Sequence, residues 1–133
     1  MTAEDWKYVE EKLKSFYNIV KLNCDGYKVD ILLARVGQFK NEIRVYVNGV
    51  VNGEWCIKEC EESRRFLRKI SRSVYSQKQK DRYKKMSKKM QKHIGVDIDR
   101  KYSYYLPSWT SFNSLKSQLI KENSSIVLIK ERD

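Results

Sequence analysis

The chain has little of several residue types, and each shortage narrows what the protein can be. Its 133 residues include one proline and five glycines, which argues against long disordered linkers, so we expect a single domain over residues 1–133. No run of about 20 apolar residues occurs, so we expect no membrane-spanning helix. The first residues lack the basic-then-apolar order of a secretory signal, and we therefore expect a cytoplasmic protein.

Histidine and cysteine are too scarce for most metal centres. The chain holds one histidine, His93, and three cysteines, Cys24, Cys56 and Cys60, without CxxC spacing. An odd cysteine count without a secretory signal indicates reduced thiols. The four side chains match zinc ligands in type but not in spacing, and Cys56 and Cys60 also fit core positions. We expect no metal and no cofactor.

Positive charge, in contrast, is abundant, and it is concentrated in one segment. The whole chain has 28 Lys and Arg against 17 Asp and Glu, a net charge of +11. Between Arg64 and Lys92 there are 13 basic residues and one acid, Asp81, so this segment alone carries the excess. Such a concentration indicates contact with a polyanion. The predicted contact residues are Arg64, Arg65, Arg68, Lys69, Arg72, Lys78, Lys80, Arg82, Lys84, Lys85, Lys88, Lys89 and Lys92.

The hydrophobic pattern predicts an α+β fold. Helical spacing of apolar residues indicates a first helix from Ala3 to Tyr17. The period then changes to two, and Asp25-Gly26 is a strong hairpin-turn signal. The alternation predicts a three-stranded antiparallel meander with flanking helices, whose strands centre on Val20–Cys24, Val29–Leu33 and Ile43–Val47.

The second half predicts a long basic helix over residues 58–93, bent or broken near 76–81. Phe66, Leu67, Ile70 and Val74 share one apolar stripe, whereas the stripe of Tyr83, Met86, Met90 and Ile94 lies elsewhere on the helix. No straight helix offers both stripes to one core. If the second half projects, its stripe needs a partner, and a second copy of the chain is one candidate. A C-terminal strand–helix–strand follows, with a strand at 102–106, a helix capped by Thr110 or Ser111, and a strand at 125–130.

The basic segment predicts a non-enzymatic binding protein. Counterion release makes phosphate contacts by Lys and Arg favourable, and the planar Arg side chain suits phosphate geometry. Tyr75 and Tyr83 are candidates either to stack on bases or to pack on protein. Many Lys-rich helix faces are merely solvated, but those usually mix charges of both signs. An anionic membrane surface is disfavoured because the first apolar stripe is needed for the core.

Two alternatives use other residues or partners. The chain could inhibit a host protein by gripping its surface without touching nucleic acid. It could also be a metal-dependent nuclease, because Asp30 and the Glu42-x-Arg44 pattern fall on adjacent predicted strands. Ordinary cross-strand ion pairing explains the same residues.

A cluster of aromatic residues precedes the last predicted helix. We expect Trp109 and Phe112 to lie in the core. Tyr102, Tyr104 and Tyr105 fit either a stacking platform or the rim of the core.

Two resemblances accompany these patterns. The order helix, three strands, basic helix over residues 3–76 resembles a double-stranded-RNA-binding domain, which implies RNA-duplex binding. The segments at 43–56 (IRVYVNGVVNGEWC) and 106–123 (LPSWTSFNSLKSQLIKEN) resemble small accessory proteins of phages and prophages from Gram-positive bacteria. That group includes transcription and replication factors and anti-defence inhibitors such as anti-CRISPR proteins. The resemblance implies nucleic acid, a nucleoprotein such as a guide-loaded nuclease, or a host defence protein as partner.

Overall fold

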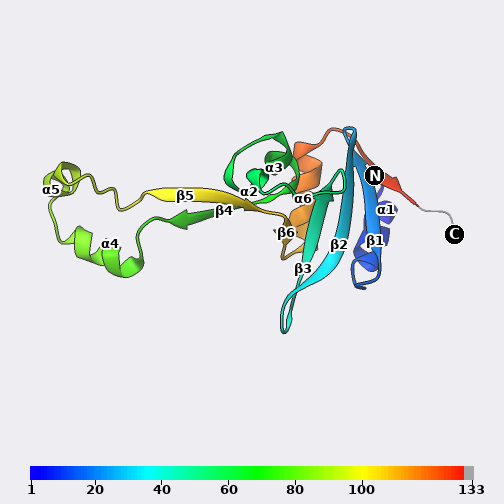
Figure 1. Cartoon of the computed structure of the whole chain (residues 1–133), viewed down its shortest axis with the longest axis horizontal. Helices are drawn as coiled ribbons and strands as arrows, with labels where there is room; N and C mark the ends of the chain where they lie inside the picture. Colours follow the sequence, from blue (N-terminus) through cyan, green and yellow to red (C-terminus); the bar gives the residue numbers. More distant parts are fainter. Residues whose placement is uncertain (131–133) are drawn as a thin grey trace. The chain divides into compact units, whose positions relative to one another are not determined.

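The computed structural model describes residues 1–130 and confirms the α+β class. Within these residues the chain forms six helices and seven strands (Figure 1). In chain order they are α1 (Ala3–Lys12), β1 (Ile19–Cys24), β2 (Tyr27–Gly37), β3 (Lys40–Val47), α2 (Glu54–Ile57), α3 (Glu61–Phe66), β4 (Arg68–Ser73), α4 (Gln77–Lys84), α5 (Lys88–His93), β5 (Lys101–Leu106), β6 (Ser108–Trp109), α6 (Phe112–Glu122) and β7 (Ile126–Ile129).

The chain divides into two compact units. The first, which we call the sheet unit, comprises Met1–Lys69 and the residues from Tyr105 onward. The second, the basic unit, comprises Ile70–Tyr104. The boundary passes through β4 and β5. Compactness does not show whether either unit folds alone, so the single domain stays a prediction.

Helix α1 begins as its sequence predicts and ends earlier. The Thr2 hydroxyl accepts from the Asp5 N–H, and the Asp5 carboxylate accepts from the Thr2 N–H, which forms a capping box. The helix ends at Lys12, whose carbonyl accepts a hydrogen bond from the Asn18 side chain at 3.2 Å. The predicted end at Tyr17 was wrong, and Phe16 is left exposed.

The meander is confirmed, and its turns explain its register. Asp25 and Gly26 have φ of 50° and 92°, the left-handed pair that a two-residue hairpin turn requires. Residue pairs run from Cys24 opposite Tyr27 to Ile19 opposite Leu32. Asn48 and Gly49 form a second left-handed turn after β3, at φ of 52° and 82°.

Two further strands widen the sheet to five, in the order β6-β3-β2-β1-β7. The two residues of β6 cover the edge of β3, and β7 forms the opposite edge beside β1. The predicted last strand is therefore an edge strand. Its burial alternates, and Val127 and Ile129 remain exposed on the face of the sheet opposite the core.

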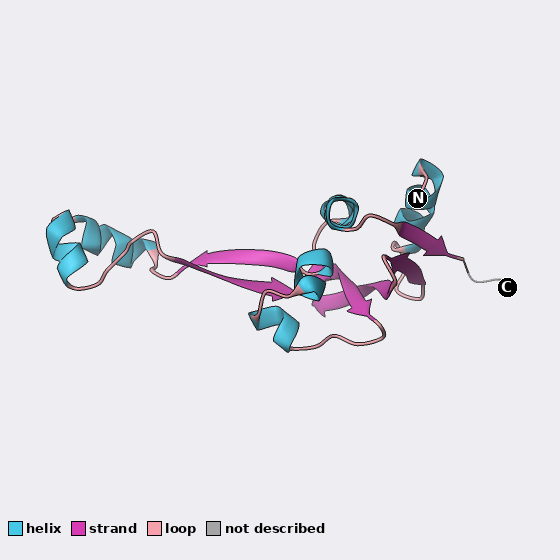
Figure 2. Ribbon diagram, turned by 90° about the horizontal axis from the view of Figure 1, so that it is seen from above, coloured by secondary structure: helices cyan, strands magenta, loops and turns pink. Residues whose placement is uncertain are grey.

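The helices α1, α3 and α6 and one face of the sheet share a single core. Val9, Phe66, Leu115 and Leu119 from these helices are fully buried with the inward residues of the strands. Trp6 meets Phe112 edge-to-face at 6.3 Å, so α1 and α6 are neighbours over the same face (Figure 2). The buried hydrophobic residues of β1, β2 and β3 are Val20, Leu22, Cys24, Val29, Ile31, Ile43, Val45 and Val47.

The long basic helix over residues 58–93 was wrong. Its first part is the short helix α3, after which residues 68–73 form strand β4. Helix resumes only at α4 and is interrupted again before α5. The apolar stripe divides accordingly: Phe66 and Leu67 are buried, whereas Val74 is exposed. In residues 3–76, the region that resembles a double-stranded-RNA-binding domain, β3 is thus followed by two short helices, α2 and α3.

A substitution at the centre of this core tests the packing. Phe66 is fully buried and contacts Tyr27 edge-to-face at 5.4 Å. We expect Phe66→Ala to lower the free energy of unfolding by about 3–5 kcal/mol, because the site cannot collapse around the cavity. Phe39→Ala removes the same side chain from a turn where it is 95% exposed, and should cost less than about 0.5 kcal/mol. Urea unfolding measures both; similar losses would contradict the described core.

Candidate nucleic-acid interface

The fold divides the 13 predicted contact residues between the two units. Nine of them fall in the basic unit, where 11 Lys and Arg and three Asp give a net charge of +8. Except for Lys80, which is half-buried, all nine are exposed. They are Arg72, Lys78, Lys80, Arg82, Lys84, Lys85, Lys88, Lys89 and Lys92.

Local capping fixes the two helices that carry most of this charge. Ser76 and Gln79 form a capping box at the start of α4, and Ser87 accepts from the Met90 N–H at the start of α5. The Gln91 side chain donates to the carbonyls of Tyr83 at 2.7 Å and Met86 at 3.2 Å, which ties α5 to the end of α4. The lysines are therefore displayed on short but defined helices.

The positive charge of the basic unit has no internal counterion. Among the ion pairs between described residues, none involves a Lys or Arg of residues 70–104. Asp81, the one acid of α4 and α5, accepts a hydrogen bond from the Gln77 side chain at 3.0 Å. The charge thus faces solvent without neutralisation inside the unit.

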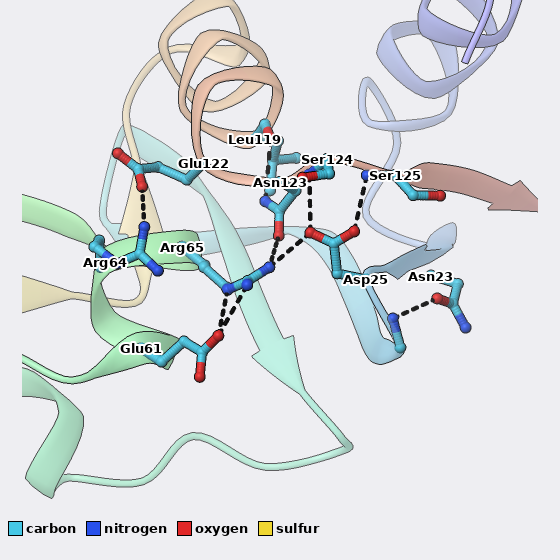
Figure 3. A network of polar contacts seen from close by, with 11 residues as sticks. Asn23, Asp25, Glu61, Arg64, Arg65, Leu119, Glu122, Asn123, Ser124 and Ser125 are labelled. Atoms are coloured by element: carbon cyan, nitrogen blue, oxygen red, sulfur yellow. Dashed lines mark hydrogen bonds and ion pairs between the residues drawn. The ribbon is translucent and has the colours of Figure 1, made fainter.

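The other four predicted residues lie in the sheet unit, and three of them have partners there. Arg64 pairs with Glu122 at 2.5 Å, and the Arg68 guanidinium donates to the Ser108 carbonyl at 3.1 Å. Arg65 is held at 2.7 Å from Asp25 and 2.8 Å from Glu61 (Figure 3). The fourth, Lys69, is exposed on β4.

Asp25 is the hub of this second network. One carboxylate oxygen accepts from the Ser124 N–H and from Arg65, and the other accepts from the Ser125 N–H (Figure 3). These contacts join the β1–β2 turn, α3 and the segment after α6. Hydrogen bonds from the Ser124 backbone and the Arg65 side chain hold the pKa of Asp25 below its usual value. Arg64 and Arg65 therefore stabilise the fold, and most of the predicted contact residues without an ion pair lie in the basic unit.

Strands β4 and β5 form a two-stranded ribbon that Figure 1 draws in opposite directions. The Val74 N–H donates to the Arg100 carbonyl, and the Ser71 and Ser103 hydroxyls meet at 3.2 Å. Both pairs fit one antiparallel register, which sets Arg72 opposite Tyr102. The basic helices α4 and α5 lie at the end of this ribbon, between β4 and β5 in the chain (Figure 1).

The aromatic residues separate into structural and exposed groups. Tyr75 and Tyr83 contact each other edge-to-face at 5.5 Å, which packs α4 against the end of β4. Tyr105 and Trp109 are buried, and the Trp109 indole donates to the Phe66 carbonyl. The prediction of Trp109 as core is confirmed, and Phe112 packs against that core while half-buried.

Tyr102 and Tyr104 form the second group, in which Tyr102 is exposed and Tyr104 is half-buried. Their rings stack at a centroid distance of 6.1 Å on the ribbon, and Tyr102 is 52% exposed. This pair follows from the alternation within 101–106, which places both rings on one face of a strand. The sequence left the role of these tyrosines open because it did not reveal that β5 pairs with β4.

The residues of the nuclease alternative do not converge. Asp30 lies opposite Tyr46, whereas Glu42 lies opposite Ala34. Four residues of strand, about 13 Å, therefore separate the positions of the two carboxylates. Metal ligands must lie within about 2–2.6 Å of one ion, so this pair cannot share one. Nor does any group of three or more His, Cys, Asp or Glu within residues 1–130 have an arrangement that could hold a metal ion.

The three cysteines likewise belong to no candidate metal site within residues 1–130. Cys24, Cys56 and Cys60 form no disulfide within the described chain. Burial of Cys24 raises its pKa to about 12, so this thiol stays protonated at neutral pH. Cys60 lies 3.0 Å from the Ser63 hydroxyl at the start of α3.

Apolar side chains are interleaved with the lysines of α4 and α5. Met86, Met90 and Ile94 are exposed by 37–50%. A shallow hollow beside them is lined by Ser87, Lys89, Met90, Lys92 and His93.

The helices of residues 1–130 all lack the combination of length and apolar character that crossing a bilayer requires.

Comparison with known proteins finds no matching family model, no matching curated protein and no matching solved structure.

The Asp25 network predicts a pH-dependent contribution to stability. The pKa of Asp25 is lower in the folded chain than its unfolded value of about 3.9. The carboxylate therefore stabilises the fold above that pH, and the stabilisation is lost as pH falls through the folded pKa. We expect Asp25→Asn, which keeps the left-handed turn geometry, to lower the free energy of unfolding at pH 7. The deficit should shrink below about pH 4. Urea unfolding over a pH series measures it, and a deficit independent of pH would contradict this role.

Proposed function

We propose that this chain is a non-enzymatic nucleic-acid-binding protein that contacts the phosphate backbone through its basic unit. The observation that carries the proposal is the net charge of +8 on residues 70–104, with no ion pair to another described residue. Each phosphate contact by such a cation releases a condensed counterion, which makes binding favourable without sequence recognition.

The placement of the charges supports a role outside the fold. The first turns of α4 and α5 carry lysine and no acid, although that end of a helix is stabilised by Asp and Glu. Lys78, Lys88 and Lys89 therefore oppose the helix dipole rather than complement it. Like charges four residues apart on one helix, such as Lys80 and Lys84 on α4 or Lys88 and Lys92 on α5, also repel one another. An external polyanion relieves both effects.

The exposed apolar side chains favour a second candidate, a nucleoprotein partner. Met86, Met90 and Ile94 contribute nothing to phosphate binding, but they suit contact with a protein that holds nucleic acid. A guide-loaded nuclease of a host defence system presents both surfaces, which agrees with the phage-type resemblance. A pull-down from host lysate with and without nuclease treatment separates the candidates: retention of the partner after nuclease treatment supports direct protein contact.

Reversing charge in the basic unit tests the main proposal. We expect the substitutions Lys84→Glu, Lys85→Glu, Lys88→Glu and Lys89→Glu together to weaken binding to DNA or RNA by at least about 100-fold, because phosphate contacts are lost. The dependence of log affinity on log salt should become shallower by about one unit for each lost contact. Fluorescence anisotropy against labelled oligonucleotides at several salt concentrations measures both.

A control with the same net charge separates the interface from a general electrostatic effect. Four exposed basic residues of the sheet unit, when changed to Glu, alter the total charge equally: Lys7, Arg35, Lys58 and Lys121. We expect this variant to retain binding within a few-fold. Equal losses in both variants, or wild-type protein that binds no oligonucleotide at low salt, would contradict the proposal.

A further inference from the structure

The ribbon of the basic unit presents an aromatic stack beside a cation. Tyr102 and Tyr104 lie two residues apart on β5, with ring planes 22° from parallel. A side-chain hydrogen bond with the Tyr104 hydroxyl raises the pKa of the adjacent Arg72, which places the Arg72 guanidinium beside the tyrosine pair. Arg72 and Tyr102 are both exposed.

This arrangement differs from the packing of the other paired or buried aromatic residues. Tyr75 and Tyr83 satisfy each other edge-to-face while half-buried, and Trp6, Tyr105 and Trp109 are buried in the sheet unit. Tyr102 instead leaves about half of its surface exposed, and no residue of the basic unit is buried. Its ring is therefore not required by a core.

We propose that Tyr102, with Tyr104 and Arg72, forms a base-stacking platform that directs the basic unit to single-stranded nucleic acid. The inference rests on the proposed function and specifies its substrate class. An aromatic ring stacks only on a base whose face is free, and duplex bases cover one another's faces. A single strand offers free bases to Tyr102 while the lysines of α4 and α5 contact its phosphates.

Arg72 completes the platform in two ways. Its guanidinium group lies on the same face of the ribbon as the rings, so it can contact the phosphate that follows a stacked base. The planar group is also suited to stack on bases itself. Because every base has an aromatic face, the platform binds with little sequence preference.

The test uses the full chain and three labelled probes of matched length. These are an oligothymidine of about 16 nucleotides, the same strand without bases, and a duplex. We expect wild-type protein to prefer the oligothymidine. Tyr102→Ala should weaken that complex about five- to 150-fold and leave the complexes with the abasic strand and the duplex unchanged within twofold. Fluorescence anisotropy at constant salt gives the affinities.

Three further variants control for folding and for the specific need for an aromatic ring at this position. Tyr102→Phe keeps the ring and should retain the affinity, whereas Tyr102→Leu keeps apolar bulk without the ring and should not. Tyr17→Ala removes a tyrosine of the sheet unit that is 94% exposed, and should have no effect.

The outcomes separate this inference from the proposed function. If the four-lysine reversal abolishes binding but Tyr102→Ala binds oligothymidine like wild type, the platform is wrong and the phosphate interface stands. A wild-type preference for the duplex, or an equal loss for the abasic strand, also overturns the platform. If no probe binds wild-type protein, both proposals fail.

Discussion

The basic unit must hold its geometry without a core, against its own charge. None of residues 70–104 is buried, yet the segment carries a net charge of +8. Burial of apolar surface, the main stabilising contribution in most domains, is therefore weak here. What remains is the capping box of α4, the Ser87 cap of α5, the Gln91 side chain bonded to two carbonyls, the Tyr75–Tyr83 contact and the pairing of β4 with β5.

The sheet unit solves the opposite problem. It neutralises Arg64 and Arg65 with acids distant in sequence, as Arg65 pairs with Asp25 forty residues away. Such a pair adds little when fully exposed, but Asp25 also accepts two backbone N–H groups, so the network fixes a turn and a chain reversal together. Arginines of the same basic run thus have different roles: Arg64 and Arg65 form ion pairs within the fold, whereas Arg72 forms none with a described residue.

The predictions that succeeded were those decided by local chemistry. The start of α1 at Ala3, the Asp25-Gly26 turn that fixes the meander and the cap of α6 by Ser111 were all predicted. The failure at residues 68–74 came from a choice that local chemistry does not decide. Phe66, Leu67, Ile70 and Val74 fit a helical stripe, but β4 forms because β5, about thirty residues later, provides hydrogen-bond partners. The pattern S-x-x-Q at Ser76 marks the start of α4, within the region 76–81 where a bend or break was predicted.

The charge of the candidate site was predictable from the residue composition, but the arrangement of its side chains was not. Counting charges found the segment, yet only the positions of Asp25, Glu61 and Glu122 show which arginines are neutralised. The same holds for the tyrosines, because the face shared by Tyr102 and Arg72 exists only once the ribbon forms. A segment with unpaired charge, exposed rings and no core gains stability when an anionic ligand neutralises it, since the ligand removes the repulsion that opposes the folded arrangement. The proposed binding would therefore be coupled to folding most strongly in this unit, and least in the sheet unit, where carboxylates within the chain already neutralise Arg64 and Arg65.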